Sequence, residues 1–331
     1  MTKLTFIISL ILLTVLTACN TVGNKERVIL TNITGEPNEV LVVMNKTSWN
    51  SEAGKTLKNC LEDAYYGLPQ YQAALKAIQI DQSGFTNMFQ LYRNIIDVNI
   101  STKVKKNKIW FGNDVYARPQ SYLKIDAING IEFSKLINNN TDKILEFFKN
   151  AEIERLQKAY TNHFSVDIMK LLREKYQIKV DIPSNYRVSK DSTNFTWISY
   201  ETPDMSQGIF VYSYPYQDTA QFNQVNLIKQ RDKFLKKFVD GPTKGSYMQT
   251  EHEYPVRRTA KFTSNNLYFV FLQGLWRVEG DFMGGPFVSY SFPDKENERI
   301  ICLDAYVYCP KKDKRDFIMQ MEAIIKTARY N

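Results

Sequence analysis

The spacing of apolar residues changes near Tyr176, and this change constrains the fold of the chain more than any single motif. Over residues 131–177, apolar residues recur every three or four positions, as on the buried side of a helix. After residue 177, short runs rich in β-branched and aromatic residues predict strands, with one helix near 223–239 and a last helix near 312–329. We therefore predict an α+β protein with mainly antiparallel sheets covered by helices.

The first half of the chain contains a mixture of both patterns. We expect the lysine-rich run 103–108 to form a charged hairpin loop between two strands. Two subdomains are predicted, an N-terminal α/β subdomain over 35–176 that ends in long helices, and a C-terminal antiparallel-sheet subdomain over 177–331. The expected elements before residue 131 are strands at 40–44, 77–80 and 95–100, a helix at 51–66, and a hairpin of 109–117 with 122–128.

Residues 1–18 have the parts of a lipoprotein signal peptide. Lys3 supplies the positive start, residues 6–16 are almost entirely apolar, and small residues precede Cys19. The segment resembles the lipobox of bacterial lipoproteins at each position, which implies cleavage before Cys19 and lipid on its thiol. An uncleaved signal anchor is the alternative. Residues 19–34 are polar and small, so we expect a flexible tether between the lipid and the folded body.

Composition restricts the possible classes of protein and partner. Hydrophobic residues make up 44% of the chain and aromatic residues 13%, which is enough for a packed core and argues against disorder. The net charge of +8 fits either solvated surface lysines or contact with anionic envelope material, and export argues against nucleic acid as a partner. Beyond Cys19, the cysteines Cys60, Cys302 and Cys309 have no CxxC spacing, so we expect no structural disulfide.

Three segments together resemble one family. They are Pro37-Asn38-Glu39-Val40-Leu41-Val42-Val43, Arg93-Asn94-Ile95, and residues 274–287 with the sequence GLWRVEGDFMGGPF. They are similar to an uncharacterised lipoprotein family of Bacteroidetes-type bacteria that is known only as a domain of unknown function. The resemblance implies a Gram-negative cell envelope and no particular chemistry. Because no acidic run follows Cys19, a position at the outer membrane facing the periplasm is expected. The order of elements after residue 177 also resembles the PsbP/Mog1-type α/β/α sandwich.

The block around Trp276 is the strongest candidate for a ligand-binding site. Trp276 could supply a stacking plane, and in an extended strand Arg277, Glu279 and Asp281 would share one face. Two carboxylates beside an arginine could bind a ligand or perform acid–base work. The alternative is a plain turn between strands with a surface ion pair of Arg277 and Glu279.

Recognisable catalytic motifs are missing from the sequence. It contains no GxSxG, HExxH, Walker-type or dinucleotide motif, and two histidines leave little for a zinc site. We therefore assign no catalytic residue, metal or cofactor. Tyr212, Tyr214 and Tyr216 alternate, so they could either face a glycan or peptide or pack in the core. The leading hypothesis is a non-catalytic binding or assembly module for a protein, peptide or glycan. The alternative is an envelope hydrolase that uses acidic residues near Trp276–Asp281.

Overall fold

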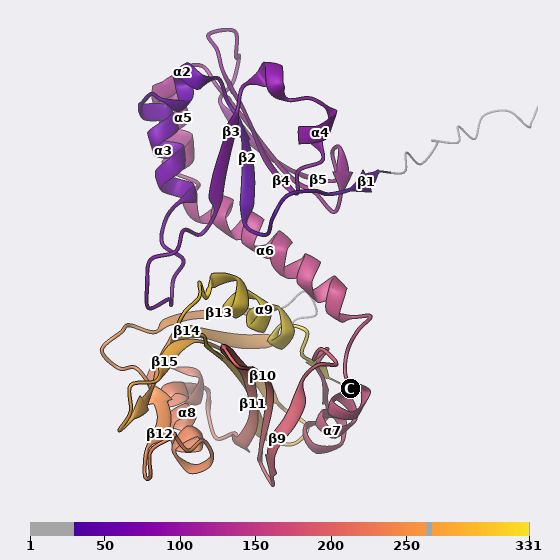
Figure 1. Cartoon of the computed structure of the whole chain (residues 1–331), viewed down its shortest axis with the longest axis vertical. Helices are drawn as coiled ribbons and strands as arrows, with labels where there is room; N and C mark the ends of the chain where they lie inside the picture. The colour runs from indigo at the N-terminus through magenta and orange to yellow at the C-terminus, as the bar shows by residue number, and fades with distance from the viewer. Residues whose placement is uncertain (1–29, 263–266, 331) are drawn as a thin grey trace, which may run out of the picture.

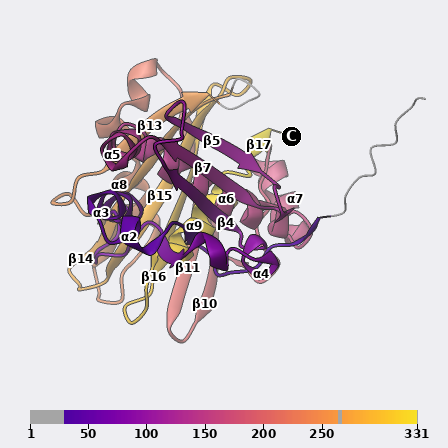
Figure 2. The same cartoon turned by 90° about the horizontal axis from the view of Figure 1, so that it is seen from above.

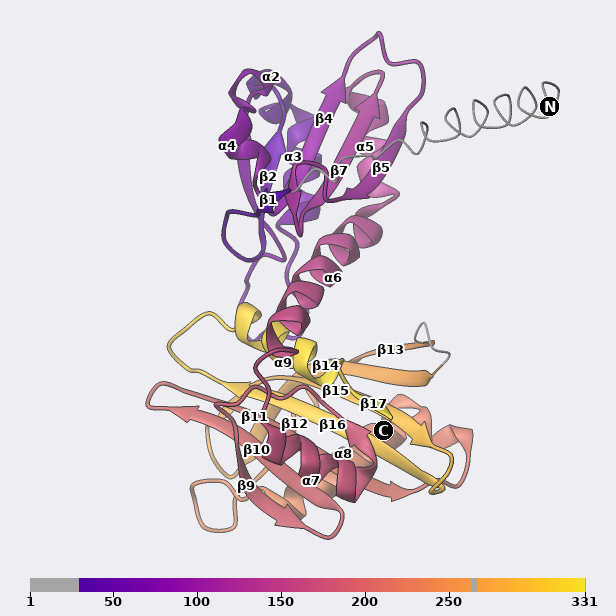
Figure 3. The same cartoon turned by 90° about the vertical axis from the view of Figure 1, so that its right-hand side faces the viewer.

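The computed structural model describes residues 30–262 and 267–330. They form two lobes stacked one above the other, with helix α6 (Thr141–Tyr160) running from the upper lobe toward the lower one (Figure 1; Figure 3). Cys19 and the predicted signal peptide lie outside the described residues, so cleavage and lipidation stay predictions. Within 30–262 and 267–330, every helix is too short or too polar to cross a membrane.

The upper lobe contains a mainly parallel sheet. β2 pairs in parallel with β3 and β4, β4 pairs in parallel with β7, and β5 pairs antiparallel with β7. The prediction of mainly antiparallel sheets is therefore wrong for this lobe. The physical reason is that helices such as α3 (Glu52–Leu61) lie between successive strands and return the chain to the same end of the sheet. The five strands, in sheet order, are β3 (Lys76–Ile80), β2 (Glu39–Val43), β4 (Asn94–Ile100), β7 (Ser121–Ala127) and β5 (Lys108–Asn113).

The connections in this lobe differ in two places from the sequence-based expectations. The hairpin of β5 with β7 is confirmed, but β7 lies between β4 and β5, so the lysine-rich run 103–108 is a crossover loop rather than a hairpin loop. Strand β1 (Thr31–Asn32) pairs in parallel with β6 (Ala117–Arg118), so the end of the expected tether is bound to the folded body.

Helices cover the two faces of the upper sheet unequally. On one face α3, α5 (Gly130–Asn138) and α6 bury a hydrophobic core that includes Leu57, Phe133 and Phe148. Figure 2 shows α3 and α5 beside each other over the strands. The short elements α2 (Lys46–Trp49), η1 (Gln82–Gly84) and α4 (Asn87–Gln90) complete the lobe.

The lower lobe contains an eight-stranded, entirely antiparallel sheet that curls into a half-barrel. The sequence over 248–257 predicts a single strand, but the structure divides it between two separate strands. Strand β9 (Arg187–Ser192) was not predicted, because its sequence is polar and it lies at the sheet edge. In sheet order the strands are β12 (Tyr247–Thr250), β14 (Tyr268–Glu279), β15 (Gly284–Asp294), β16 (Arg299–Tyr308), β11 (Met205–Pro215), β10 (Phe195–Thr202) and β9 (Arg187–Ser192), and β13 (Arg257–Phe262) also pairs with β14.

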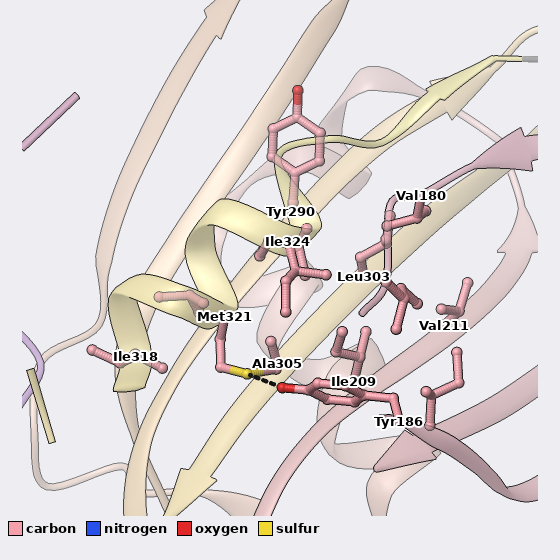
Figure 4. Close-up of a cluster of buried hydrophobic side chains, with 14 of the residues drawn as sticks. Val180, Tyr186, Ile209, Val211, Tyr290, Leu303, Ala305, Ile318, Met321 and Ile324 are labelled. Carbon is pink, nitrogen blue, oxygen red and sulfur yellow. Dashed lines mark hydrogen bonds between the residues drawn. The ribbon is translucent and has the colours of Figure 1, made fainter. Parts of the chain in front are cut away.

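Side chains of the lower sheet alternate between two hydrophobic cores. Helices α7 (Val166–Tyr176) and α9 (Arg315–Ile325) pack on one face, and α8 (Gln224–Phe238) packs on the other. Figure 4 shows the first core, where Ile318, Met321 and Ile324 of α9 point toward the strands and the Tyr186 hydroxyl donates a hydrogen bond to the Met321 Sδ at 3.3 Å. The remaining elements are β8 (Ile178–Lys179), which pairs with β17 (Arg329–Tyr330), and η2 (Thr219–Phe222).

The same alternation places the cysteines. Cys302 belongs to the core under α8, whereas Cys309 belongs to the core under α9. The described cysteines Cys60, Cys302 and Cys309 are all buried and free. Helix α7 packs with the lower lobe, although the predicted division at residue 176 would assign it to the upper one.

Candidate functional site

An aromatic pocket of about 650 Å³ opens at one end of the lower sheet. It lies on the α8 side, where the β10–β11 hairpin, the end of β14 and the end of β16 come together. The segment after α8 closes one wall with Pro242. The apolar side chains that line it are Trp197, Met205, Met248, Trp276, Met283, Tyr306 and Tyr308.

Two glycines inside the strands make room for the rings of this pocket. A Cβ atom added to Gly208 would lie 2.2 Å from Cε1 of Tyr306, which faces it across the β11–β16 ladder. A Cβ atom on Gly285 would lie 2.2 Å from the carbonyl oxygen of Val307 and 3.2 Å from Nε1 of Trp276. Glycine in the interior of a strand marks a place where another group approaches the backbone closely. Here the approaching groups include the two rings that form the pocket floor.

The rings of the floor hold one another in place. Trp276 is 3% exposed, and its Nε1 donates a hydrogen bond to the Val307 carbonyl oxygen at 3.3 Å. The ring centroids of Trp276 and Tyr306 are 5.6 Å apart with an edge-to-face arrangement, and Trp197 approaches Tyr306 at 6.5 Å. Edge-to-face pairs of this kind stabilise by roughly 0.5–1.5 kcal/mol beyond simple burial. The floor is therefore fixed before any ligand arrives.

A few polar groups face this apolar floor. The Ser206 hydroxyl donates to a Glu201 carboxylate oxygen at 2.9 Å and lies 3.2 Å from the Tyr306 hydroxyl. Burial raises the pKa of Tyr306, so its phenol keeps its proton and remains a possible donor. An apolar pocket with a small number of fixed polar groups is the usual form of a ligand-binding site.

The structure separates the residues of the predicted site. Trp276 points into the pocket, whereas Arg277 and Glu279 lie on β14 with opposite orientation, 46% and 45% exposed at their side chains. Arg277 Nη2 donates to Glu279 Oε2 at 2.5 Å, which is the surface ion pair considered as the alternative. Asp281 is in the turn and accepts from Thr243 Oγ1 at 2.8 Å. A ligand-binding role for Arg277, Glu279 and Asp281 stays a prediction, and they do not line the aromatic pocket.

Sequence reasoning did not find Trp197, Met205 or Tyr306 as pocket residues, because they are far apart in the chain. Gly208 and Gly285 gave no clear signal, since each stands at the start of a strand-forming run and looks like a turn residue in the sequence. The other aromatic residues considered, Tyr212 and Tyr214, are 1% and 7% exposed and belong to the core under α8.

A buried ion pair fixes α8 beside the pocket. Arg231 of α8 donates through Nε to Oδ2 of Asp304 at 2.7 Å and through Nη2 to Oδ1 at 3.2 Å. Both side chains are almost fully buried, and the Arg231 guanidinium also lies 3.8 Å from the centroid of the Phe287 ring. Burial raises the pKa of Asp304, and Arg231 opposes this shift. The pair sets the position of α8, and the chain directly after α8 forms a wall of the pocket.

Two family descriptions match the chain. Residues 33–161 match "Domain of unknown function (DUF8532)". Residues 165–327 match "Domain of unknown function (DUF4837)". The chain thus matches two domains of unknown function. They meet between residues 161 and 165, where α6 has ended and α7 has not yet begun.

Comparisons with named proteins add little. No curated protein matches the sequence. Among solved structures, one that matches is the "Crystal structure of LpqN involved in cell envelope biogenesis of Mycobacterium tuberculosis", with a TM-score of 0.27 and 14% sequence identity. That match covers 46% of this chain and 81% of the mycobacterial chain. A TM-score of 0.27 is too low to support an argument about fold or function.

Proposed function

We propose that this protein is a lipid-anchored cell-envelope protein whose lower lobe binds a protein or peptide partner in the aromatic pocket. The observation that supports it is the preformed pocket of about 650 Å³, whose floor consists of the Trp276 and Tyr306 rings packed against Gly285 and Gly208. Pockets of roughly 300–1,000 Å³ that are lined mainly by apolar and aromatic side chains are typical of binding sites.

The composition of the pocket favours apolar side chains of a peptide as the occupant. Met205, Met248 and Met283 contribute flexible thioether chains that can adapt to different apolar groups, as methionine does at other peptide-binding surfaces. The paired hydroxyls of Ser206 and Tyr306 could hydrogen-bond to a peptide backbone. A glycan would also stack on Trp276, but it would leave many of its hydroxyls facing methionines.

The cellular location is proposed from the sequence. The lipobox-like segment supports cleavage before Cys19 and a lipid anchor there, and each buried methylene of the lipid contributes about 0.8 kcal/mol to membrane binding. The resemblance to Bacteroidetes-type lipoproteins supports an outer-membrane position facing the periplasm. We also propose that the lower lobe has a PsbP/Mog1-like α/β/α arrangement, since helices cover both faces of its sheet.

The alternative function, an envelope hydrolase centred on Glu279 and Asp281, has less support. The Glu279 carboxylate is half-exposed and accepts hydrogen bonds from Arg277 and Gln249. Asp281 is half-buried in the turn, where it accepts a hydrogen bond from the Thr243 hydroxyl. A general acid or base normally lies in a pocket that shifts its pKa and excludes water.

The proposal is tested by placing a charge in the pocket. Peptide and cell-wall glycan arrays would first supply binders, whose affinities are then measured by fluorescence anisotropy. Met283→Glu should weaken peptide binding at least tenfold, because Met283 lines the pocket. Phe282→Glu is the matched control, because Phe282 is next to Met283 in the sequence but its side chain is fully exposed, with 107% relative exposure. This control should change the affinity less than twofold. Equal affinities for both variants, or binders found only on the glycan array, would overturn the peptide proposal.

A further inference from the structure

A second cavity lies between the two lobes, and none of its lining residues belongs to the aromatic pocket. It has a volume of about 550 Å³ and is lined by α6 and the loop after α3 from the upper lobe, and by β13, β14 and α9 from the lower lobe. Figure 3 shows α6 descending onto α9 at this junction. Cavities at the junction of two folded units are common positions for small-molecule sites.

One buried carboxylate holds two lysines at this cavity. Glu322 of α9 is 1% exposed. Its Oε2 accepts from Lys149 Nζ of α6 at 2.9 Å, and its Oε1 accepts from Lys326 Nζ at 2.6 Å. The Tyr65 hydroxyl also donates to Oε2, at 3.4 Å. One carboxylate therefore fixes two ammonium groups that come from different lobes.

The arrangement leaves positive charge directed at the cavity. Two ammonium groups face a single carboxylate, so the cluster of Lys149, Lys326 and Glu322 carries one excess positive charge. Each ammonium has three N–H donors. Among the residues that the structure describes, Glu322 is the acceptor that each ammonium contacts, so donors remain free on both. The side chains of Lys149 and Lys326 are 28% and 26% exposed, and both residues line the cavity.

Aromatic rings form the apolar part of the same cavity. Lys149 Nζ is 6.0 Å and Lys326 Nζ is 5.1 Å from the centroid of the Phe271 ring. At the rim, the Arg257 guanidinium lies 3.9 Å from the centroid of the Tyr66 ring, and no carboxylate of the described chain lies within ion-pair distance of it. Acidic residues also reach the rim, namely Asp63, Asp142 and Glu146, of which Glu146 pairs with Lys261 at 3.2 Å.

We propose that the cavity between the lobes binds a small ligand through a carboxylate or phosphate group held by Lys149 and Lys326, with its apolar part against Phe271. Charge-assisted hydrogen bonds from two ammonium groups suit either anion. Since one lysine comes from α6 and the other follows α9, the ligand contacts both lobes and stabilises their present arrangement.

Isothermal titration calorimetry of the full-length protein tests this site. The probes are inorganic phosphate and acetate, each compared with sodium chloride at equal ionic strength. The anion that binds with higher affinity identifies the anion class. We expect saturable binding that Lys326→Gln weakens at least tenfold and that Lys326→Arg retains within about threefold. Lys158→Gln, an exposed change on α6 outside the cavity, should leave the affinity unchanged.

Folding of the variants is checked by circular dichroism, because Lys326 contacts a buried carboxylate. Should Lys326→Gln fail to fold, Arg257→Gln decides instead, since Arg257 is exposed and does not contact Glu322. That change should weaken binding of the anion at least threefold. The proposal is overturned if neither anion binds saturably to the wild-type protein. It is also overturned if the folded variant binds with wild-type affinity.

Discussion

The charge of one residue, Glu322, connects the stability of the protein to pH. Burial opposes ionisation of this carboxyl group, but the ammonium groups of Lys149 and Lys326 outweigh burial and lower its pKa from 4.5 to about 2. A carboxyl group with a lower pKa in the folded state stabilises that state above its unfolded pKa, and the stabilisation is lost as the pH falls toward the folded pKa.

This shift predicts a specific acid sensitivity. The wild-type protein should lose on the order of 3 kcal/mol of stability as the pH falls from 5 toward 2, from about 1.4 kcal/mol per pKa unit. Glu322→Gln should be less stable at pH 7, because two lysines then lack their carboxylate, and its stability should depend less on pH below 5. Urea denaturation at a series of pH values measures both effects. Parallel pH profiles for the two proteins would show that Glu322 does not carry this dependence.

Two cysteines are predicted to be unreactive in the folded protein. Burial raises the pKa of Cys60 to about 11 and that of Cys302 to about 12, so neither forms much thiolate near neutrality. A thiol reagent such as DTNB at pH 8 should label them slowly in buffer and rapidly in urea, as followed by mass spectrometry of the labelled peptides. Rapid labelling of Cys302 in buffer would show that the core under α8 opens readily.

Single residues also show which features of the structure could be predicted from the sequence. Cys302 and Cys309 are seven residues apart, and alternation along a strand puts such residues on opposite faces, which agrees with their places in two different cores. Trp276 belongs to the predicted site and lines the aromatic pocket, but its partners Trp197 and Tyr306 come from other strands. Their meeting depends on strand order, which local sequence does not encode.

Strand β15 is sensitive to a small change at Gly285. Gly285→Ala would place a methyl group 2.2 Å from the Val307 carbonyl oxygen, so β15 and β16 must separate. Overpacking of this kind costs roughly 1–3 kcal/mol. Urea denaturation should show that loss, while Gly84→Ala, which meets no atom within 4 Å, should have an effect below about 0.5 kcal/mol. Equal stabilities for the two variants would mean that the protein does not need a glycine at position 285.

Helices and strands were predicted better than their pairing. The helical pattern over 131–177 corresponds to α5, α6 and α7, with a break between Tyr160 and Val166. The parallel upper sheet was not found, because short apolar strands such as β2 look alike in parallel and antiparallel sheets. Edge strand β9 lacks an apolar run, and its place in the sheet depends on pairing with β10.

For the whole molecule, the stacking of the lobes depends on contacts between the two halves of the chain. Asn38 Nδ2 donates to Asp316 Oδ1 at 2.8 Å, and Gln72 Oε1 accepts from the backbone of Lys314 at 3.0 Å. The last helix, α9, lies against the upper lobe, and this brings these residues together. Sequence patterns predicted the two halves, but they could not predict this docking, because polar contacts between lobes leave no periodic signal.

Crosslinking in living cells tests most directly whether the aromatic pocket is a partner-binding site. A photoreactive phenylalanine analogue would replace Met283 at the pocket, and in a control protein it would replace Val225, an exposed residue of α8 outside the pocket. The proposed function predicts one dominant crosslinked protein from position 283 that is absent from position 225. It also predicts that the purified partner competes with the array peptides for the pocket. The same products from both positions, or none from position 283, would contradict it.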